Sequence, residues 1–210
     1  MIELRNVEFS YNNSGSFRFP DFNCENGENH LIAGPSGCGK TTLLHLMAGL
    51  LRPQKGSIKV NGIDIAGLET SQVDLIRGKS IGIVFQKPYF VSSLNVGENV
   101  ELALYFNKIK KSRAEITTIL DKLNIGDKYN VKPRTLSQGE QQRLSIARAI
   151  VNKPSIILAD EPTSSLDDAQ CDNVMNLLLE QAKAQNASLI VVTHDSRVKK
   201  YFSKIYELRD

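Results

Sequence analysis

The stretch GPSGCGKT, Gly34 to Thr41, decides the fold of this chain. It matches the phosphate-loop pattern in full: a glycine, four residues, then Gly-Lys followed by Thr. The apolar run HLIA precedes it at 30–33, and a segment of helical periodicity follows it from Lys40, so the pattern stands between a strand and a helix. A glycine-rich turn without a ligand is the simpler interpretation, but the complete pattern in this context favours a nucleotide site.

Each residue type in this loop has a chemical reason. Glycines let the backbone turn so that successive N–H groups point at phosphate oxygens, and the following helix adds the partial positive charge of its N-terminus. The pattern predicts that Lys40 contacts the β- and γ-phosphates and that the Thr41 hydroxyl ligates Mg²⁺. Cys38 is either a small residue that fills the loop or a thiol whose pKa the helix N-terminus lowers.

Strands and helices alternate on both sides of the loop. Alternating or continuous apolar runs predict strands, and apolar residues three and four apart predict helices. The expected strands cover residues 2–11, 30–33, 80–86, 155–160, 188–195 and 204–208, with a hairpin over 56–65 through Asn61-Gly62, and the expected helices cover 40–51 and 168–184. Residues 87–151 are mostly helical in pattern and contain no convincing strand.

This order predicts an α/β fold. It consists of a phosphate-loop NTPase core with a parallel sheet, a small antiparallel β subdomain near the N-terminus and an inserted helical subdomain. We expect a single domain over residues 1–210, in which 1–86 and 154–210 form the catalytic core and 87–153 form the helical subdomain.

Composition limits the class of partner and the cell compartment. The 210 residues include 26 Lys and Arg against 23 Asp and Glu, and the net charge of +3 is too balanced for a nucleic-acid-binding protein. No apolar run is long enough to span a bilayer, and the N-terminal alternation is unlike a signal peptide. Three widely spaced cysteines predict neither a disulfide framework nor a metal site, which favours a reduced, cytoplasmic location.

Polar residues follow three further apolar strands, at Gln86, Asp160-Glu161 and His194. In an open parallel sheet, ligands lie beyond the carboxyl ends of the strands. We expect Asp160 to hold Mg²⁺ through water and Glu161 to polarise the attacking water. An Asp-Glu pair after a strand is often a solvated turn, and a lone histidine is usually structural. Their position downstream of a phosphate loop favours the functional interpretation.

The stretch LSQGE, Leu136 to Glu140, predicts a second glycine-containing helix start. Ser137 and Glu140 have capping-box spacing, so a well-capped helix accounts for both. It does not account for Gly139, which weakens a helix by about 1 kcal/mol relative to Ala and suggests a close approach to the backbone. A free helix N-terminus beside a serine hydroxyl is an anion site. Since one phosphate loop needs one such helix, the second would serve the nucleotide of another molecule.

Taken in order, these motifs resemble those of the ATP-binding subunits of ABC transporters, and the resemblance covers nearly the whole chain. The matching residues are Tyr11 for the aromatic residue that stacks on adenine, Gly34 to Thr42 for Walker A, Gln86 for the Q-loop, Leu136 to Glu140 for the signature, Ile156 to Asp160 for Walker B, Glu161 for the catalytic glutamate, Ser165 to Asp167 for the D-loop and His194 for the switch histidine. The sequence departs from the family at Gln138, where Gly is usual, and at Glu140, where Gln is usual. We expect Gln138, at the first helical position, to point away from the phosphate and to leave activity intact.

The resemblance implies ATP and Mg²⁺ as ligands. The expected nucleotide contacts are Tyr11, Gly34, Pro35, Ser36, Gly37, Cys38, Gly39, Lys40, Thr41, Thr42, Ser137, Gln138, Gly139, Glu140 and Asp167. The expected Mg²⁺ site consists of Thr41, Gln86 and Asp160, and the expected catalytic residues are Glu161, His194, Lys40 and Gln86.

The resemblance also implies partners. Two copies of the chain would pack head to tail when ATP binds, so that Ser137 and Gly139 of one copy close on the γ-phosphate held by the other. A separate transmembrane permease subunit would receive the motion at the inner face of the cell membrane, where this chain would be peripheral. Tyr89 and Phe90 are candidate contacts of that subunit, or they simply pack the helical subdomain.

Local stretches most resemble the branch that includes the lipoprotein-releasing, macrolide-export and cell-division ABC ATPases. That branch implies export, or extrusion of lipoproteins, peptides or drugs. Ser164 makes an amino-acid importer the nearest alternative, and a nucleotide-gated regulator of a membrane complex, which moves no substrate, also stays open. A chromosome or DNA-repair ATPase would need a long inserted coiled coil, which the sequence lacks.

Overall fold

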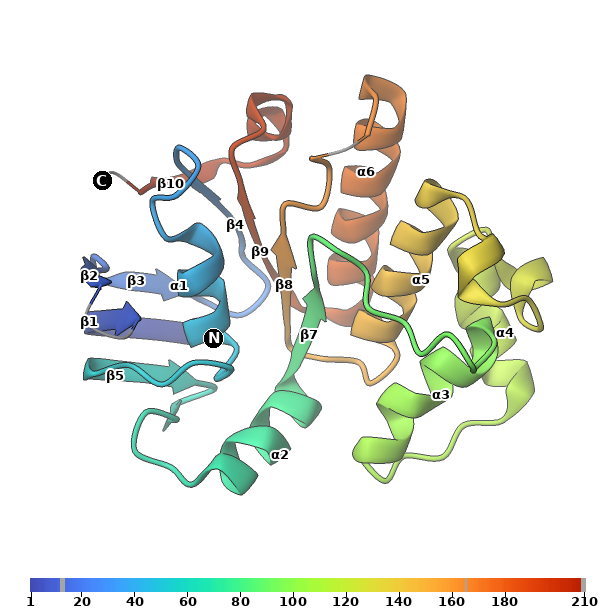
Figure 1. Ribbon diagram of the computed structural model, residues 1–210, viewed down its shortest axis with the longest axis horizontal. Coiled ribbons are helices and arrows are strands. Elements are labelled where there is room, and N and C mark those ends of the chain that lie inside the picture. Colours follow the sequence, from blue (N-terminus) through green and yellow to red (C-terminus); the bar gives the residue numbers. More distant parts are fainter. Residues whose placement is uncertain (12–13, 165, 209–210) are drawn as a thin grey trace.

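A parallel β-sheet forms the centre of the protein (Figure 1). The computed structural model describes residues 1–11, 14–164 and 166–208. The sheet runs in the order β10 (Lys204–Glu207), β4 (Asn29–Ala33), β9 (Ser188–Thr193), β8 (Ile156–Asp160) and β7 (Ile81–Val84), and every neighbouring pair is parallel. The predicted α/β class with a parallel sheet is confirmed.

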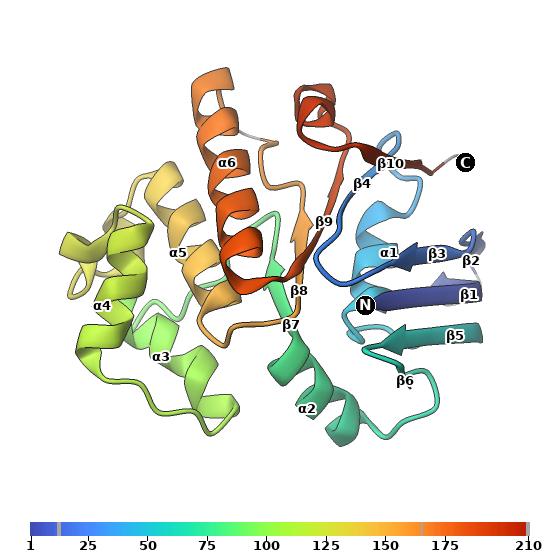
Figure 2. The same ribbon diagram turned by 180° about the vertical axis from the view of Figure 1, so that it is seen from behind.

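Both faces of this sheet are buried, which explains why its strands are continuous apolar runs rather than alternating ones. Along β8, Ile156 and Leu158 belong to one apolar cluster, and Ile157 and Ala159 belong to the other. Helix α1 lies with the antiparallel sheet on the first side, and α3, α5 and α6 lie on the second (Figure 2). These helices are α1 (Lys40–Met47), α3 (Val96–Phe106), α5 (Gln138–Ile150) and α6 (Asp168–Gln185).

The N-terminal third contributes the antiparallel sheet. Its strands are β1 (Ile2–Tyr11), β2 (Ser14–Arg18), β3 (Phe22–Cys24), β5 (Lys55–Val60) and β6 (Ile63–Asp64). The two-residue turn Asn61-Gly62 joins β5 to β6, and both turn residues have positive φ, 49° and 82°. That geometry is the type I′ turn which Asn-Gly favours, so the predicted hairpin is confirmed.

Residues 87–151, all of which the structure describes, contain helices and no strand. Besides α3 and α5, the segment holds α4 (Arg113–Lys122) and short 3₁₀ turns at Gly126–Lys128 and Pro133–Thr135. Its apolar side chains continue into the cluster that covers one face of the parallel sheet. The helical character of the segment is confirmed, whereas its boundaries at residues 87 and 153 stay a prediction.

Two helices differ from the expectation. Helix α1 ends at Met47 rather than Leu51, because Gly49 takes a left-handed backbone (φ 65°) and leaves Leu50 41% exposed. Helix α2 (Thr70–Ser80) was not predicted at all. None of its residues is buried, so its apolar periodicity is weak, and the sequence signal that it does carry is the capping box of Glu69 with Gln72.

A 3₁₀ segment, η3 (Ser196–Tyr201), follows β9. Within the described ranges, no helix is long and apolar enough to cross a membrane.

Candidate active site

The glycine loop joins β4 to α1 at the carboxyl edge of the parallel sheet. Gly37 and Gly39 have φ of 91° and 93°, a conformation that L side chains rarely adopt. At Gly34 the reason is different: an added Cβ would lie 2.7 Å from the Leu208 carbonyl oxygen. The structure therefore favours glycine at all three positions, of which the phosphate-loop pattern specifies Gly34 and Gly39.

Lys40 lies buried inside this loop. Its Nζ donates hydrogen bonds to the carbonyl oxygens of Gly34 (2.9 Å) and Pro35 (2.7 Å) and lies 4.0 Å from Glu161 Oε1. The ammonium group thus sits where the loop closes around it, facing the strand end that carries Glu161. An anion in the loop would find this positive charge already in place.

Thr41 and Asp160 lie together, as predicted. The Thr41 hydroxyl donates to Asp160 Oδ1 over 3.1 Å, and the Asp160 carboxylate is buried at the end of β8. Burial raises the pKa of Asp160, while the Thr41 hydrogen bond and the nearby Lys40 and His45 act in the opposite direction. A hydroxyl and a carboxylate are oxygen donors of the kind that Mg²⁺ prefers, and a cation here would stabilise the ionised carboxylate. The residues therefore fit a Mg²⁺ ion.

Glu161 has the most constrained carboxylate in the site. It follows β8 with a φ of 45°, a strained value for a residue with a side chain. Its Oε2 accepts a 2.6 Å hydrogen bond from the Thr193 hydroxyl, and its Oε1 accepts from the His194 backbone N–H over 3.2 Å. The His194 Nδ1 lies 2.7 Å from the same Oε1. The ends of β8 and β9 are thereby joined through one carboxylate.

A cavity of about 290 Å³ connects these groups. Its lining brings together the loop, Gln86 after β7, Glu161 and His194, as the sequence predicts. The full lining is Phe17, Ser36, Gly37, Gly39, Lys40, Thr41, Thr42, Gln86, Glu161 and His194. Phe17 was not predicted, because no local pattern shows that β2 folds over the loop.

Tyr11 lies beside this cavity. Its hydroxyl is 3.3 Å from the Thr42 hydroxyl, and its ring packs edge to face on Phe9 (4.7 Å) and Phe17 (6.4 Å between centroids). Together Tyr11 and Phe17 present aromatic surface next to the phosphate loop. Phe17 also stacks on Phe19 at 5.9 Å, which fixes its ring.

The second glycine-containing helix start opens α5 and lies apart from this cavity. Ser137 caps the helix: its Oγ accepts from the Glu140 N–H (3.3 Å), and Glu140 Oε2 accepts from the Ser137 N–H (2.8 Å). The predicted capping box is present, and Gln138 occupies the first helical position with an exposed side chain. A separate cavity of about 510 Å³ is lined by Ser137, Gln138, Gly139 and Glu140 together with side chains of α6.

Gly139 has no packing reason to be glycine within the described chain. An added Cβ would meet only Gln170 Oε1, at the ordinary contact distance of 3.8 Å. Its φ is not positive either, in contrast to Gly37 and Gly39. The packing of the described chain therefore does not explain why residue 139 is glycine.

The predicted D-loop is only partly described. Ser165 lies outside the described residues. Asp167 caps α6, because its Oδ1 accepts from the Gln170 N–H over 2.8 Å. Arg197 holds the same loop: its Nη1 donates to Leu166 O (3.2 Å), and its guanidinium pairs with Asp195 (2.8 Å). Asp167 therefore has a structural role as the cap of α6, besides the predicted contact with nucleotide.

The three cysteines are buried and unpaired. Burial of Cys38 within the loop favours its role as a small packing residue. Cys24 lies with Glu28 and His30, their ligand atoms all within 4.8 Å, which the sequence analysis missed. The geometry does not make this a metal site: Glu28 accepts from Lys204 and lies 3.0 Å from His30 Nε2, while burial raises the pKa of the Cys24 thiol to about 11.

The fold and this site define a phosphate-loop nucleotide hydrolase, and comparison with known proteins narrows the class. The family model described as "ABC transporter" matches residues 18–164. The chain belongs to the ABC transporter family, and it is an ATP-binding ATPase of that family.

Relatives match over nearly the whole chain. The lipoprotein-releasing system ATP-binding protein LolD of Hydrogenovibrio crunogenus is 36% identical over 100% of this chain and 94% of its own length. An uncharacterized ABC transporter ATP-binding protein of Methanocaldococcus jannaschii, MJ1508, is 38% identical over 100% of this chain and 96% of its own length.

Solved structures agree with the fold. A dimeric structure of the bacterial ABC transporter cassette MJ0796 superposes with a TM-score of 0.90 at 34% identity, over 99% of this chain and 94% of that one. A dimeric post-hydrolysis state of the same cassette, bound to ADP and Pi, superposes with a TM-score of 0.91 at 34% identity, over 100% and 94% of the two chains.

The hydrogen bond from Thr193 to Glu161 gives a first prediction. Thr193→Val keeps the shape of the side chain but removes the donor that fixes Glu161 Oε2. A hydrogen bond to a charged group contributes about 1.5–3 kcal/mol, so we expect kcat for ATP hydrolysis to fall about tenfold or more while KM stays close to that of the parent. Thr193→Ser keeps the donor and serves as the control. An unchanged kcat in Thr193→Val would show that this bond does not position the carboxylate during turnover.

The departure at Gln138 gives a second prediction. Its side chain is exposed at the first turn of α5, so Gln138→Gly changes neither the cap nor the packing. A glycine at this helical position costs about 1 kcal/mol of stability but removes no contact with the nucleotide, and we expect the ATPase rate to stay within about threefold of the parent. A steady-state ATPase assay decides it. A rise by orders of magnitude would mean that Gln138 obstructs the signature.

Proposed function

We propose that this chain is the ATP-hydrolysing subunit of a transporter, and that it works as an ATP-dependent homodimer which powers a separate membrane subunit. The observation that carries the proposal is the second helix start. Ser137 and Gly139 line a cavity that is separate from the one at the phosphate loop. The packing of the described chain does not require glycine at position 139. A second copy that brings its phosphate loop to this cavity accounts for both features. The dimeric form of the similar MJ0796 cassette supports it.

The residues divide the chemistry as follows. Tyr11 stacks on the adenine, and the loop from Gly34 to Thr42 holds the phosphates around Lys40. Thr41, Gln86 and Asp160 would hold a Mg²⁺ ion, whose charge would offset that of the phosphates. Catalysis of such transfers rests mainly on positioning and on electrostatic stabilisation.

Glu161 and His194 act in the hydrolysis of the γ-phosphate. Glu161 orients the attacking water or takes its proton, since it lines the phosphate-loop cavity beside Lys40. His194, already bonded to Glu161, holds the γ-phosphate. Signature residues Ser137 to Glu140 and Asp167 close the site from the other copy. Loss of the γ-phosphate then removes contacts that hold the two copies together. The closed dimer is therefore less stable with ADP than with ATP, and it opens.

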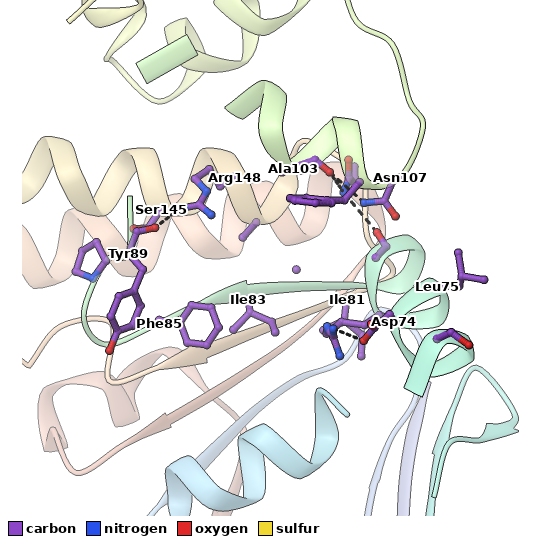
Figure 3. A pocket seen from close by; sticks show the side chains of 18 residues that line it. Asp74, Leu75, Ile81, Ile83, Phe85, Tyr89, Ala103, Asn107, Ser145 and Arg148 are labelled. Carbon is purple, nitrogen blue, oxygen red and sulfur yellow. Dashed lines mark hydrogen bonds and ion pairs between the residues drawn. The ribbon is translucent and has the colours of Figure 1, made fainter. Parts of the chain in front are cut away.

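A groove on another face suits the membrane subunit. It encloses about 700 Å³ between α2, β7, α3 and α5. Figure 3 shows Ile81, Ile83 and Phe85 along one wall and Ala103, Ser145 and Arg148 along the other. Two aromatic side chains on its lining, Tyr89 and Phe106, are each 72% exposed. Tyr89 is therefore a candidate contact of the partner, whereas Phe90 packs against the apolar cluster of the helical segment.

Similarity is the only support for a direction of transport. Likeness to a lipoprotein-releasing system ATP-binding protein supports export, or extrusion of lipoproteins, peptides or drugs, from the inner face of the cell membrane. An importer ATPase and a regulator of a membrane complex that moves no substrate are the alternatives. The transported molecule would be selected by the membrane subunit.

A cysteine at the groove tests the coupling to a membrane protein. Because the three native cysteines are buried, Tyr89→Cys supplies an exposed thiol for a photoactivatable crosslinker. We expect it to crosslink in membranes to one integral protein, whose reconstitution with this chain gives ATP-dependent movement of substrate across vesicles. Lys55→Cys, on β5 in the antiparallel sheet, is the exposed control. Crosslinking without transport in either direction would favour the regulator, and inward movement would favour the importer.

A further inference from the structure

The groove between α2, β7, α3 and α5 contains one charged side chain without an opposite charge. Three of its lining residues are charged at neutral pH: Asp74, Arg77 and Arg148. Asp74 and Arg77 neutralise each other, with Asp74 Oδ1 2.6 Å from Arg77 Nη2. Arg148 forms no salt bridge with any described residue. The lining therefore carries a net positive charge, located on Arg148.

Arg148 is held in place rather than extended into solvent. It projects from α5, its Nη1 donates to the Tyr89 carbonyl oxygen, and its guanidinium carbon lies 5.8 Å from the centre of the Phe90 ring. Its Nε is buried and has no acceptor among the described residues. Burial lowers the pKa of Arg148, and no carboxylate opposes that effect. A guanidinium stays charged in proteins, so the structure keeps an unpaired, partly desolvated cation here.

Asn152 adds an unpaired acceptor four residues further on. Its Nδ2 donates to the carbonyl oxygen of Ala103 over 3.2 Å, while its Oδ1 is buried and receives no hydrogen bond from the described residues. Figure 3 shows Arg148 across the groove from Ile81 and Ile83 on β7, with its nitrogens directed toward the enclosed space. The groove thus offers an apolar wall and a charged donor.

We propose that the membrane subunit fills this groove with an apolar segment that carries one Asp or Glu, and that its carboxylate pairs with Arg148. The inference rests on the proposed function, which places the membrane subunit in the groove, and adds the chemistry of the inserted segment. Charge complementarity selects a carboxylate, because a neutral segment would cover the Arg148 guanidinium without supplying an opposite charge.

Selection from a display library of random peptides tests this without knowledge of the partner. The full chain is the bait, and R148Q is the comparison. We expect the parent to enrich apolar peptides with one Asp or Glu, and R148Q to enrich apolar peptides without that preference. R77Q removes a charge from the same groove that Asp74 already neutralises, so it serves as the matched control and should keep the preference.

Affinity measurements on the parent chain need no variant and guard against poor folding of R148Q. An enriched peptide should bind the parent about tenfold more tightly than its copy with Gln in place of the acid, as expected for a hydrogen bond to a charged group. Equal binding of the acidic peptide and its Gln version would overturn the inference and leave the proposed docking in place, and so would an acidic preference that persists in a folded R148Q. If the parent enriches no apolar peptide, both the pairing with Arg148 and the proposed docking in the groove are overturned.

Discussion

Glu161→Gln should stop turnover and trap two copies of the chain around ATP. The substitution keeps the size of the side chain, but an amide neither takes a proton from water nor accepts from Thr193 and His194 in the same way. General base catalysis contributes about 10²- to 10⁴-fold, and we expect the ATPase rate to fall by a factor in that range. Nucleotide binding should persist, because Lys40 and the loop backbone are unchanged.

The solution mass of Glu161→Gln is the decisive measurement. With ATP and Mg²⁺ we expect the mass to double from that of one chain, 23.3 kDa, because slow hydrolysis preserves the closed state. With ADP it should stay at one chain. A variant that binds ATP tightly and remains a monomer at every protein concentration would contradict the homodimer, unless a membrane subunit is needed for assembly.

Ser137→Arg should abolish this dimer while leaving each chain able to bind ATP. Ser137 is exposed at the start of α5 and lines a different cavity from that of the phosphate loop. In the proposed dimer, a long side chain there would collide with the nucleotide held by the other copy. We expect ATP hydrolysis to fall to background and the Glu161→Gln, Ser137→Arg double variant to stay monomeric with ATP.

Loss of the cap could by itself weaken α5, so Ser137→Ala is the control. It removes the Oγ that accepts from Glu140 N–H and should cost about 1 kcal/mol in stability. It adds no bulk and should still permit dimerisation in the Glu161→Gln background. If Ser137→Arg dimerises and hydrolyses ATP like the parent, the LSQGE stretch is only a well-capped helix.

Prediction from the sequence succeeded where backbone chemistry is local. The loop from Gly34 to Gly39 is recognisable because its glycines are required by a positive φ or by a close contact with neighbouring atoms. The buried strands are recognisable because both faces of the parallel sheet are covered, which makes them continuous apolar runs. Polar residues directly after β8 and β9 were placed together correctly, since the carboxyl ends of parallel strands share one edge.

Prediction failed where a feature depends on several elements at once. Helix α2 has no fully buried residue, and its apolar face is limited to residues such as Val73 and Ile76, which pack at the edge of the core. Phe17 joins the phosphate-loop cavity only because β2 pairs with β1 beside it. The groove with Arg148 is lined from α2, β7, α3 and α5, and nothing in the stretch SIARAI distinguishes an unpaired arginine from a solvated one.

The division of the apolar interior by the parallel sheet affects how this protein tolerates change over generations. Buried side chains between α1 and the sheet belong to one apolar cluster, and those between α5 and the sheet belong to the other. Substitutions in different clusters therefore affect different apolar contacts. Their effects on the free energy of unfolding should be nearly additive. A lineage that improves packing on the α1 side therefore gains a margin of stability that a costly substitution on the α5 side can use. Such a margin would allow the proposed docking groove to diverge while the phosphate loop stays unchanged.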